Sequence, residues 1–297
     1  MTMQACFAPD GLSAFAAAYP GSPAAVRHQL HHHPLFALEE LARLAERLPA
    51  SHVEHSFGNL KVDQDPAGIH QADMPVGEIV RTIEQNGCWM VLKKVDIDPA
   101  YAALIDACLA EIAPVVEPAT GAYQRREAFV FLSSPNAVTP FHMDPEHNIL
   151  LQIAGSKTMR VYPADDADIV AQGMHEAFHR GGAHRNMRHD PEFDPKAQDF
   201  AMGPGDAVHV PVKAPHWVQN GPERSVSFSI TWRSRASDGE ARLHRVNRRL
   251  RSFGLSPAAP GTHPGADAAK IAAHRLAKGA IRTFRRLGGQ HNGREAY

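Results

Sequence analysis

The sequence has few cysteines, no long apolar run and no recognisable leader. Cys6, Cys88 and Cys108 are its 3 cysteines, and no two of them form a C-x-x-C pair. So few and scattered cysteines predict no disulfide framework and favour a reduced, cytoplasmic protein. No run of about 18 apolar residues is present, so we expect no membrane-spanning helix. The first 20 residues lack the basic start and apolar centre of a signal peptide.

Charge is distributed unevenly along a chain of ordinary globular composition, 43% hydrophobic and 21% charged. The 297 residues include 31 Lys and Arg against 32 Asp and Glu, a net charge of −1. From Arg233 to the end, 14 basic residues stand against 4 acidic ones, so this tail carries +10 and residues 1–232 carry −11. Such a tail can bind nucleic acid, an acidic partner or an anionic surface. We favour a solvated helical face or a tail docked on its own acidic body.

The first part of the chain predicts an α+β region. Residues 1–33 form an N-terminal extension, whose His31-His32-His33 tract is more typical of a surface turn than of a metal site. In the flanking region 34–126, apolar residues spaced by three and four predict helices over residues 34–48, 78–85 and 99–112. The short apolar run at residues 88–92 predicts a buried strand.

From about Glu127 the hydrophobic period becomes that of strands. Short strands are predicted over residues 128–132, 148–153, 158–162, 207–211 and 225–232, separated by turns containing Gly, Pro or Asn. Many short strands of this kind favour an antiparallel barrel or jelly roll as the core, over residues 127–235. In residues 225–232, Ser and Thr alternate with apolar residues, which predicts hydroxyls facing a polar cavity inside the barrel.

Two further segments flank or interrupt this core. An irregular insert at about residues 164–200 carries His175, His179, His184 and His189, and it is longer than ordinary loops. We match its spacings to no zinc pattern, and we favour a histidine-decorated lid over a second metal site. Residues 236–297 predict a basic tail of two helical segments joined by a Pro- and Ala-containing linker.

The stretch Thr139-Pro140-Phe141-His142-Met143-Asp144 carries the strongest chemical signal. His142 and Asp144 are two residues apart, so in a strand their side chains point to the same face. Two histidines and one carboxylate with open positions are diagnostic of non-haem Fe(II) oxygenases. A third ligand must then come from another strand. His216 is our candidate, because it follows a Gly-Pro-Gly-Asp turn and a predicted strand; His147 and His209 are the alternatives.

An anionic co-substrate such as 2-oxoglutarate also needs a cation inside the barrel. Lys157 begins a predicted strand directly after Ala154-Gly155-Ser156 and suits this role. Thr139, three residues before His142, can add a hydroxyl.

Together these residues resemble the JmjC (cupin-like) Fe(II)- and 2-oxoglutarate-dependent oxygenases, and within them the asparaginyl-hydroxylase-like subgroup. The resemblance covers about residues 129–232 and includes the His142–Asp144 stretch, Asn148, Gln152-Ile153, Gly155, Lys157 and the turn before His216. It implies a mostly β fold with a double-stranded β-helix core, an α+β N-terminal part and a helical C-terminal tail. It also implies iron ligands at His142, Asp144 and His216, 2-oxoglutarate held by Lys157 and Thr139, and Asn148 in the site.

The chain departs from the subgroup's pattern in several places. Thr231 and Arg233 stand where the subgroup has an asparagine and a tryptophan. We expect Thr231 to line the site, and Arg233 either to act as a second anion anchor or to begin the basic tail. The tyrosine that usually helps to bind the co-substrate has only weak candidates, Tyr123 and Tyr162.

We therefore expect an Fe(II)/2-oxoglutarate oxygenase that hydroxylates a peptide side chain or a small molecule with O₂, releasing succinate and CO₂. The alternative is a non-catalytic cupin-like module whose basic tail contacts nucleic acid, although no helix-turn-helix is evident. The same iron fold with another co-substrate is a third hypothesis. Leu243, Val246 and Leu250 could pair two chains into a homodimer through the tail helices, as the resemblance implies.

Overall fold

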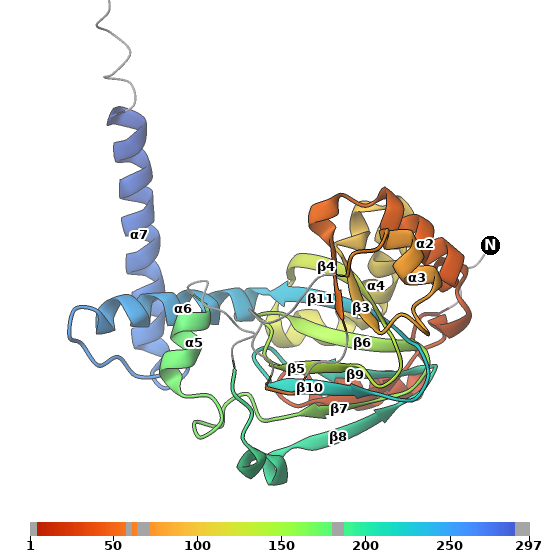
Figure 1. Cartoon of the computed structure of the whole chain (residues 1–297). Helices are drawn as coiled ribbons and strands as arrows, with labels where there is room; N and C mark the ends of the chain where they lie inside the picture. The colour runs from red at the N-terminus through yellow and green to blue at the C-terminus, as the bar shows by residue number, and fades with distance from the viewer. Residues whose placement is uncertain (1–4, 58–60, 64–71, 180–186, 289–297) are drawn as a thin grey trace, which may run out of the picture. The chain divides into compact units, whose positions relative to one another are not determined.

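The computed structural model describes residues 5–57, 61–63, 72–179 and 187–288 (Figure 1). They divide into two compact units, one from Met1–Val170 and Ala183–Ser237 and the other from Ala171–Gly182 and Asp238–Tyr297. The first unit holds all the strands found in the described residues, and the second is helical.

Two antiparallel sheets form the core of the first unit. The larger has the order β1-β9-β6-β11-β4-β3-β2, and the smaller has the order β5-β10-β7-β8. This is the mostly β core with flanking helices that the sequence predicted. The larger sheet contains β1 (Ala24–Arg27), β2 (Val53–Phe57), β3 (Cys88–Lys93), β4 (Tyr123–Ser133), β6 (His147–Ala154), β9 (Asp206–Val210) and β11 (Ser225–Ser234). The smaller contains β5 (Val138–His142), β7 (Lys157–Val161), β8 (Gln198–Met202) and β10 (His216–Asn220).

Strand β11 shows how side-chain alternation separates the two faces of the larger sheet. Its apolar residues, such as Phe228 and Trp232, are buried in the main core cluster. Its hydroxyls face the opposite way: Ser227 donates to Gln152 Oε1 at 2.7 Å, and Ser229 donates to Asn148 Oδ1 at 2.8 Å. The prediction of a hydroxyl-lined inner face is therefore confirmed.

Helices pack on the outer face of the larger sheet (Figure 1). They are α1 (Pro9–Ala18), α2 (Leu38–Arg47), α3 (Val76–Arg81) and α4 (Pro99–Thr120). The predicted helix at 34–48 begins only at Leu38, because Pro34–Phe36 forms a 3₁₀ turn. Asp98 caps α4 by accepting from the Ala100 N–H, and the helix continues well past residue 112.

Helix α4 is long and apolar enough to cross a membrane, although the sequence contains no single apolar run that predicted such a span. Its apolar stripe, which includes Tyr101, Ile105 and Ile112, is buried in the main core cluster. Packing against the sheet therefore accounts for this helix without a membrane.

The insert contains more regular secondary structure than the sequence suggested, and part of it belongs to the same compact unit as the tail. The insert contains α5 (Gln172–Phe178) and a 3₁₀ turn at Pro191–Lys196. Strand β8 begins at Gln198, before the predicted end of the insert at about residue 200. The predicted tail helices are present as α6 (Arg235–Arg251) and α7 (Pro264–Gly288). His175 and His179 are buried in the helical unit, so the prediction of a histidine-decorated lid is wrong for these two residues. His184 lies outside the described residues.

Candidate metal centre

The His142–Asp144 stretch lies at the end of β5, the edge strand of the smaller sheet. Strand β10 pairs with β5 in an antiparallel register that sets His216 directly opposite His142. The third ligand predicted from sequence therefore comes from the neighbouring strand. The structure brings His142, Asp144 and His216 together as a group whose ligand atoms lie within 4.8 Å of one another, the one such group in the described residues.

The three ligand groups converge on one point. Asp144 Oδ2 lies 3.7 Å from His142 Nε2 and 3.8 Å from His216 Nε2. His216 is buried, whereas Asp144 keeps part of its surface exposed. Two imidazoles and one carboxylate with an open side form the donor set that non-haem Fe(II) prefers, so this site fits iron.

Backbone carbonyls hold both imidazoles in the tautomer that a metal requires. His142 Nδ1 is 2.7 Å from the Pro140 carbonyl oxygen, and His216 Nδ1 is 2.9 Å from that of Ala214. A carbonyl only accepts, so each Nδ1 carries the proton and each Nε2 presents a lone pair. The ligand geometry is thus fixed by the chain itself.

The alternative third ligands lie elsewhere. His209 is fully buried on the outer face of the larger sheet, where its Nδ1 contacts the Ser22 carbonyl at 3.2 Å. Burial lowers the pKa of His209 to about 4. His147 stacks on Trp232 within the same aromatic cluster. Both are packed core histidines, as the sequence suggested for His209.

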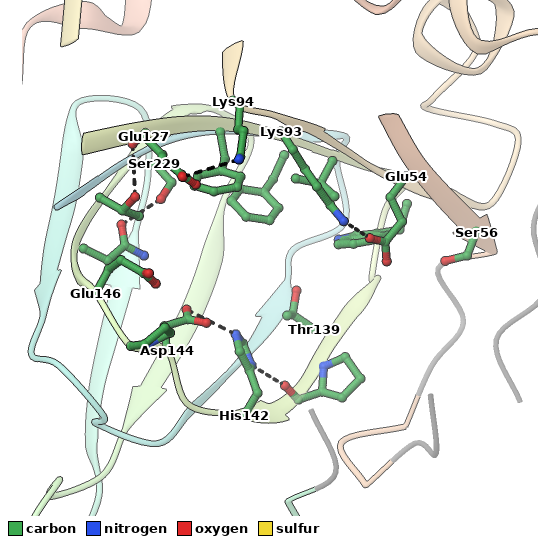
Figure 2. A pocket seen from close by; sticks show the side chains of 18 of the residues that line it. Glu54, Ser56, Lys93, Lys94, Glu127, Thr139, His142, Asp144, Glu146 and Ser229 are labelled. Atoms are coloured by element: carbon green, nitrogen blue, oxygen red, sulfur yellow. Dashed lines mark hydrogen bonds and ion pairs between the residues drawn. The ribbon is translucent and has the colours of Figure 1, made fainter. Parts of the chain in front are cut away.

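A cavity of about 420 Å³ opens beside the ligands (Figure 2). This volume is within the usual range for small-molecule sites. His142 and Asp144 lie at one end, Thr139 lies beside them, and the Lys93–Glu54 pair lies further away. Three of the residues predicted to bind the co-substrate line the cavity: Thr139, Asn148 and Thr231.

Lys157 occupies a deeper position inside the barrel. Strand β10 pairs His216 with Val161 and Asn220 with Lys157, so the lysine lies four residues further along the barrel than the metal ligands. It is buried, and no partner is found for its ammonium group among the described residues. Burial lowers the pKa of Lys157 to about 7. The turn before it requires glycine: Gly155 has a φ of 69°, and a Cβ would lie 2.1 Å from the Arg224 carbonyl oxygen.

Arg233 forms an ion pair with Glu146 next to the site. Its Nε and Nη2 donate to Glu146 Oε1 at 2.9 and 2.6 Å. The pair lines a smaller neighbouring cavity of about 90 Å³, and of the two only Glu146 also lines the larger one. Burial raises the pKa of Glu146. The role of Arg233 as an anion anchor stays a prediction.

The cavity contains residues that sequence reasoning missed. Trp89, Phe129 and Phe131 form an aromatic wall, and two ion pairs lie beside it, Lys93–Glu54 and Lys94–Glu127. Alternation along β3 and β4 was the available signal, because these residues face away from the helical core. Neither candidate tyrosine lines the cavity: Tyr123 donates to the Leu109 carbonyl, and Tyr162 donates to Asp194.

Comparison with known proteins gives the family. A family model described as a cupin-like domain matches residues 20–238, more than two thirds of the chain. The chain therefore belongs to the cupin-like domain family. This membership confirms the family that the residues from Thr139 to His216 had indicated.

The sequence relatives match about a third of this chain. The chain is 32% identical over 104 residues to Jumonji C domain-containing protein 5 of Drosophila melanogaster, covering 33% of this chain and 26% of that protein. It is 27% identical over 100 residues to lysine-specific demethylase 8 of Danio rerio, covering 32% and 24%. The chain thus spans about a quarter of the length of the curated relatives it matches.

Among solved structures, the chain is similar to the Escherichia coli ribosomal oxygenase YcfD. The TM-score is 0.51 at 16% identity, and the match covers 93% of this chain and 68% of YcfD. A second YcfD structure, solved with cobalt and 2-oxoglutarate, matches with a TM-score of 0.50 at 16% identity, covering 88% and 64%. At this identity the likeness shows a shared fold.

Proposed function

We propose that the protein is an Fe(II)- and 2-oxoglutarate-dependent oxygenase. It would hydroxylate a C–H bond of a peptide side chain or a small molecule, with succinate and CO₂ as co-products. The observation that carries this proposal is the convergence of His142, Asp144 and His216 beside an open cavity, with both imidazoles held by backbone carbonyls.

The position of Lys157 supports 2-oxoglutarate as the co-substrate. A buried ammonium without a partner is costly, and an anion that enters the barrel removes that cost. The four residue steps along β10 from His216 to Asn220 span about 13 Å, and the lysine side chain reaches part of that distance. The space left suits a short dicarboxylate, with one end at the metal and the other at Lys157 and Thr139.

The chain's own residues position the reactants. Iron, when bound by the three ligands, would supply the oxidising chemistry with O₂. Asn148 and Ser229 are bonded to each other across β6 and β11, which fixes the cavity wall beside the metal. Phe129 and Phe131 make this wall apolar and help to exclude water.

The matched relatives agree with this chemistry. The Escherichia coli protein is a ribosomal oxygenase whose structure was solved in complex with cobalt and 2-oxoglutarate. The Danio rerio relative is named as a lysine-specific demethylase. Oxygenation and demethylation of this kind share oxidation of a substrate C–H bond, which is the level at which we propose the activity.

Calorimetric titration of 2-oxoglutarate into the Mn(II)-loaded protein tests co-substrate binding. To test for a product, lysate peptides and metabolites are incubated with the protein, Fe(II) and ascorbate and are then compared by mass spectrometry. We expect saturable binding, succinate formation and substrates that gain one oxygen atom. An Asp144→Ala chain is the control and should do none of these. If the wild-type chain fails to bind 2-oxoglutarate, another co-substrate is indicated; if it binds but forms no succinate, the non-catalytic alternative stands.

A further inference from the structure

The helical unit contains a second histidine cluster, separate from the iron ligands. Residues 175–179 read His-Glu-Ala-Phe-His, and α5 with its C-terminal cap places both histidines on one face of a helical turn. Histidines four residues apart in H-E-x-x-H on a helix are a zinc-ligand arrangement, so the expectation that the spacings of the insert match no zinc pattern was wrong for His175 and His179. The motif alone is a weak signal, so it needs a third ligand from elsewhere in the fold.

Helix α6 supplies that ligand, and Figure 1 shows α5 lying beside it. The ring of His244 is 5.5 Å from that of His175 and 4.9 Å from that of His179, measured between centroids. Two imidazoles on one tetrahedral zinc have centroids about 5 Å apart, given Zn–N bonds of about 2.0–2.1 Å. All three side chains are buried.

A carboxylate and an amide complete the surroundings of His244. Glu240 Oε1 lies 3.5 Å from His244 Nε2, about the separation of two ligands on one zinc ion. Gln172 Nε2 lies 3.5 Å from His244 Nδ1; a 180° rotation of the amide would place its oxygen there to accept the ring N–H and orient the imidazole.

We propose that His175, His179 and His244, with Glu240 as the fourth ligand, bind a divalent transition ion, zinc being favoured by the donor set. Among the described residues only the iron ligands already bring their donor atoms within 4.8 Å. Binding at this second site therefore requires rotation of the imidazole rings. The ion would tie the insert helix α5 to the tail helix α6.

The second site is structural and not hydrolytic. In zinc hydrolases with H-E-x-x-H, the glutamate acts as general base on a metal-bound water. Here Glu176 is 1% exposed, and Arg251 Nε donates to its two oxygens at 2.9 and 3.2 Å. A carboxylate held in this way is not available to a water.

Zinc titration of the full chain tests the proposal, with the iron site removed by His142→Ala and Asp144→Ala. After chelation and dialysis, calorimetry and elemental analysis should find one zinc per chain, with a Kd below about 1 μM. Adding His175→Ala and His244→Ala should weaken binding at least about 100-fold. His263→Ala, at an exposed histidine of the same unit, should leave it unchanged.

Two further measurements distinguish a loss of zinc binding from a loss of folding. Circular dichroism checks each variant, and His244→Gln replaces the alanine change if that chain unfolds. Co(II) should give the intense visible bands of a tetrahedral site in the iron-site variant. The proposal is overturned if that variant binds no zinc, or if its binding persists unchanged after the His175 and His244 substitutions.

Discussion

The two histidine clusters of this protein differ in how closely their metal-binding atoms are gathered. In the barrel, His142 and His216 sit on paired strands, and neighbouring carbonyls fix each Nδ1. In the helical unit, the rings of His175 and His179 each contact that of His244, but among the described residues only the iron ligands bring their donor atoms within 4.8 Å of one another. The first cluster is therefore organised before metal arrives, whereas the second must rearrange.

This difference suits the two clusters to different roles, one catalytic and one structural. A catalytic metal needs open positions and a ligand geometry that survives turnover, and the cavity beside Asp144 provides the open side. A structural metal needs a closed set of ligands, and the three histidines of the helical unit are buried. Substitutions in each cluster and in the cavity test this difference.

Removing a barrel ligand should abolish activity, whereas removing a helical one should not. We expect His142→Ala or Asp144→Ala to lower 2-oxoglutarate turnover on the order of 10³-fold or more, because the metal's charge stabilisation is lost. His175→Ala should retain the turnover of the wild-type chain per folded molecule. Succinate formation measures both, and near-wild-type turnover in a His142→Ala, Asp144→Ala chain would contradict the assignment.

Replacing the buried lysine should weaken co-substrate binding without affecting the metal. A charge-assisted hydrogen bond is worth about 1.5–3 kcal/mol, so Lys157→Met should raise the Kd for 2-oxoglutarate about 10- to 100-fold. Titration with Mn(II) alone should be unchanged. Lys196→Met alters a surface lysine paired with Asp166 and serves as the control. Equal affinity in wild type and Lys157→Met would remove Lys157 from the site.

The lowered pKa of Lys157 predicts a pH dependence of opposite sign for binding and stability. Binding needs the charged lysine, so affinity for 2-oxoglutarate should fall by up to about tenfold per pH unit between about 7 and the ordinary value of 10.5. The unbound protein should gain stability over the same window, because the unfolded chain then binds the extra proton. Calorimetry and denaturant unfolding measure the two slopes, and both should vanish in Lys157→Met.

The smallest effect is expected at Arg233. Its guanidinium is already bonded to Glu146, so Arg233→Met should change the 2-oxoglutarate Kd less than about tenfold. It should lower the free energy of unfolding, because it leaves the partly buried carboxylate of Glu146 unpaired. Arg224→Met breaks an exposed pair with Glu84 and should cost at most about 1 kcal/mol. A larger loss of co-substrate affinity would establish Arg233 as a second anchor.

Several features of the fold and the site could be predicted from the sequence because they depend on local chemistry. The period-two pattern of residues 225–232 specified which face of β11 carries hydroxyls, and the two-residue spacing of His142 and Asp144 set both on one side. Gly155 and the glycine turn before β9 marked strand boundaries, because few other residues adopt their backbone angles. These signals depend only on neighbours in the chain.

Other features depend on strand register and packing between distant segments, so they could be seen only in the folded chain. The choice of His216 over His147 and His209 follows from the antiparallel pairing of β10 with β5, which no local pattern specifies. The burial of Lys157, the pairing of Arg233 with Glu146 and the aromatic wall likewise arise where distant strands meet. The second cluster shows the same limit: H-E-x-x-H was present in the sequence, but its third histidine lies 65 residues after His179 and became its neighbour only through helix packing.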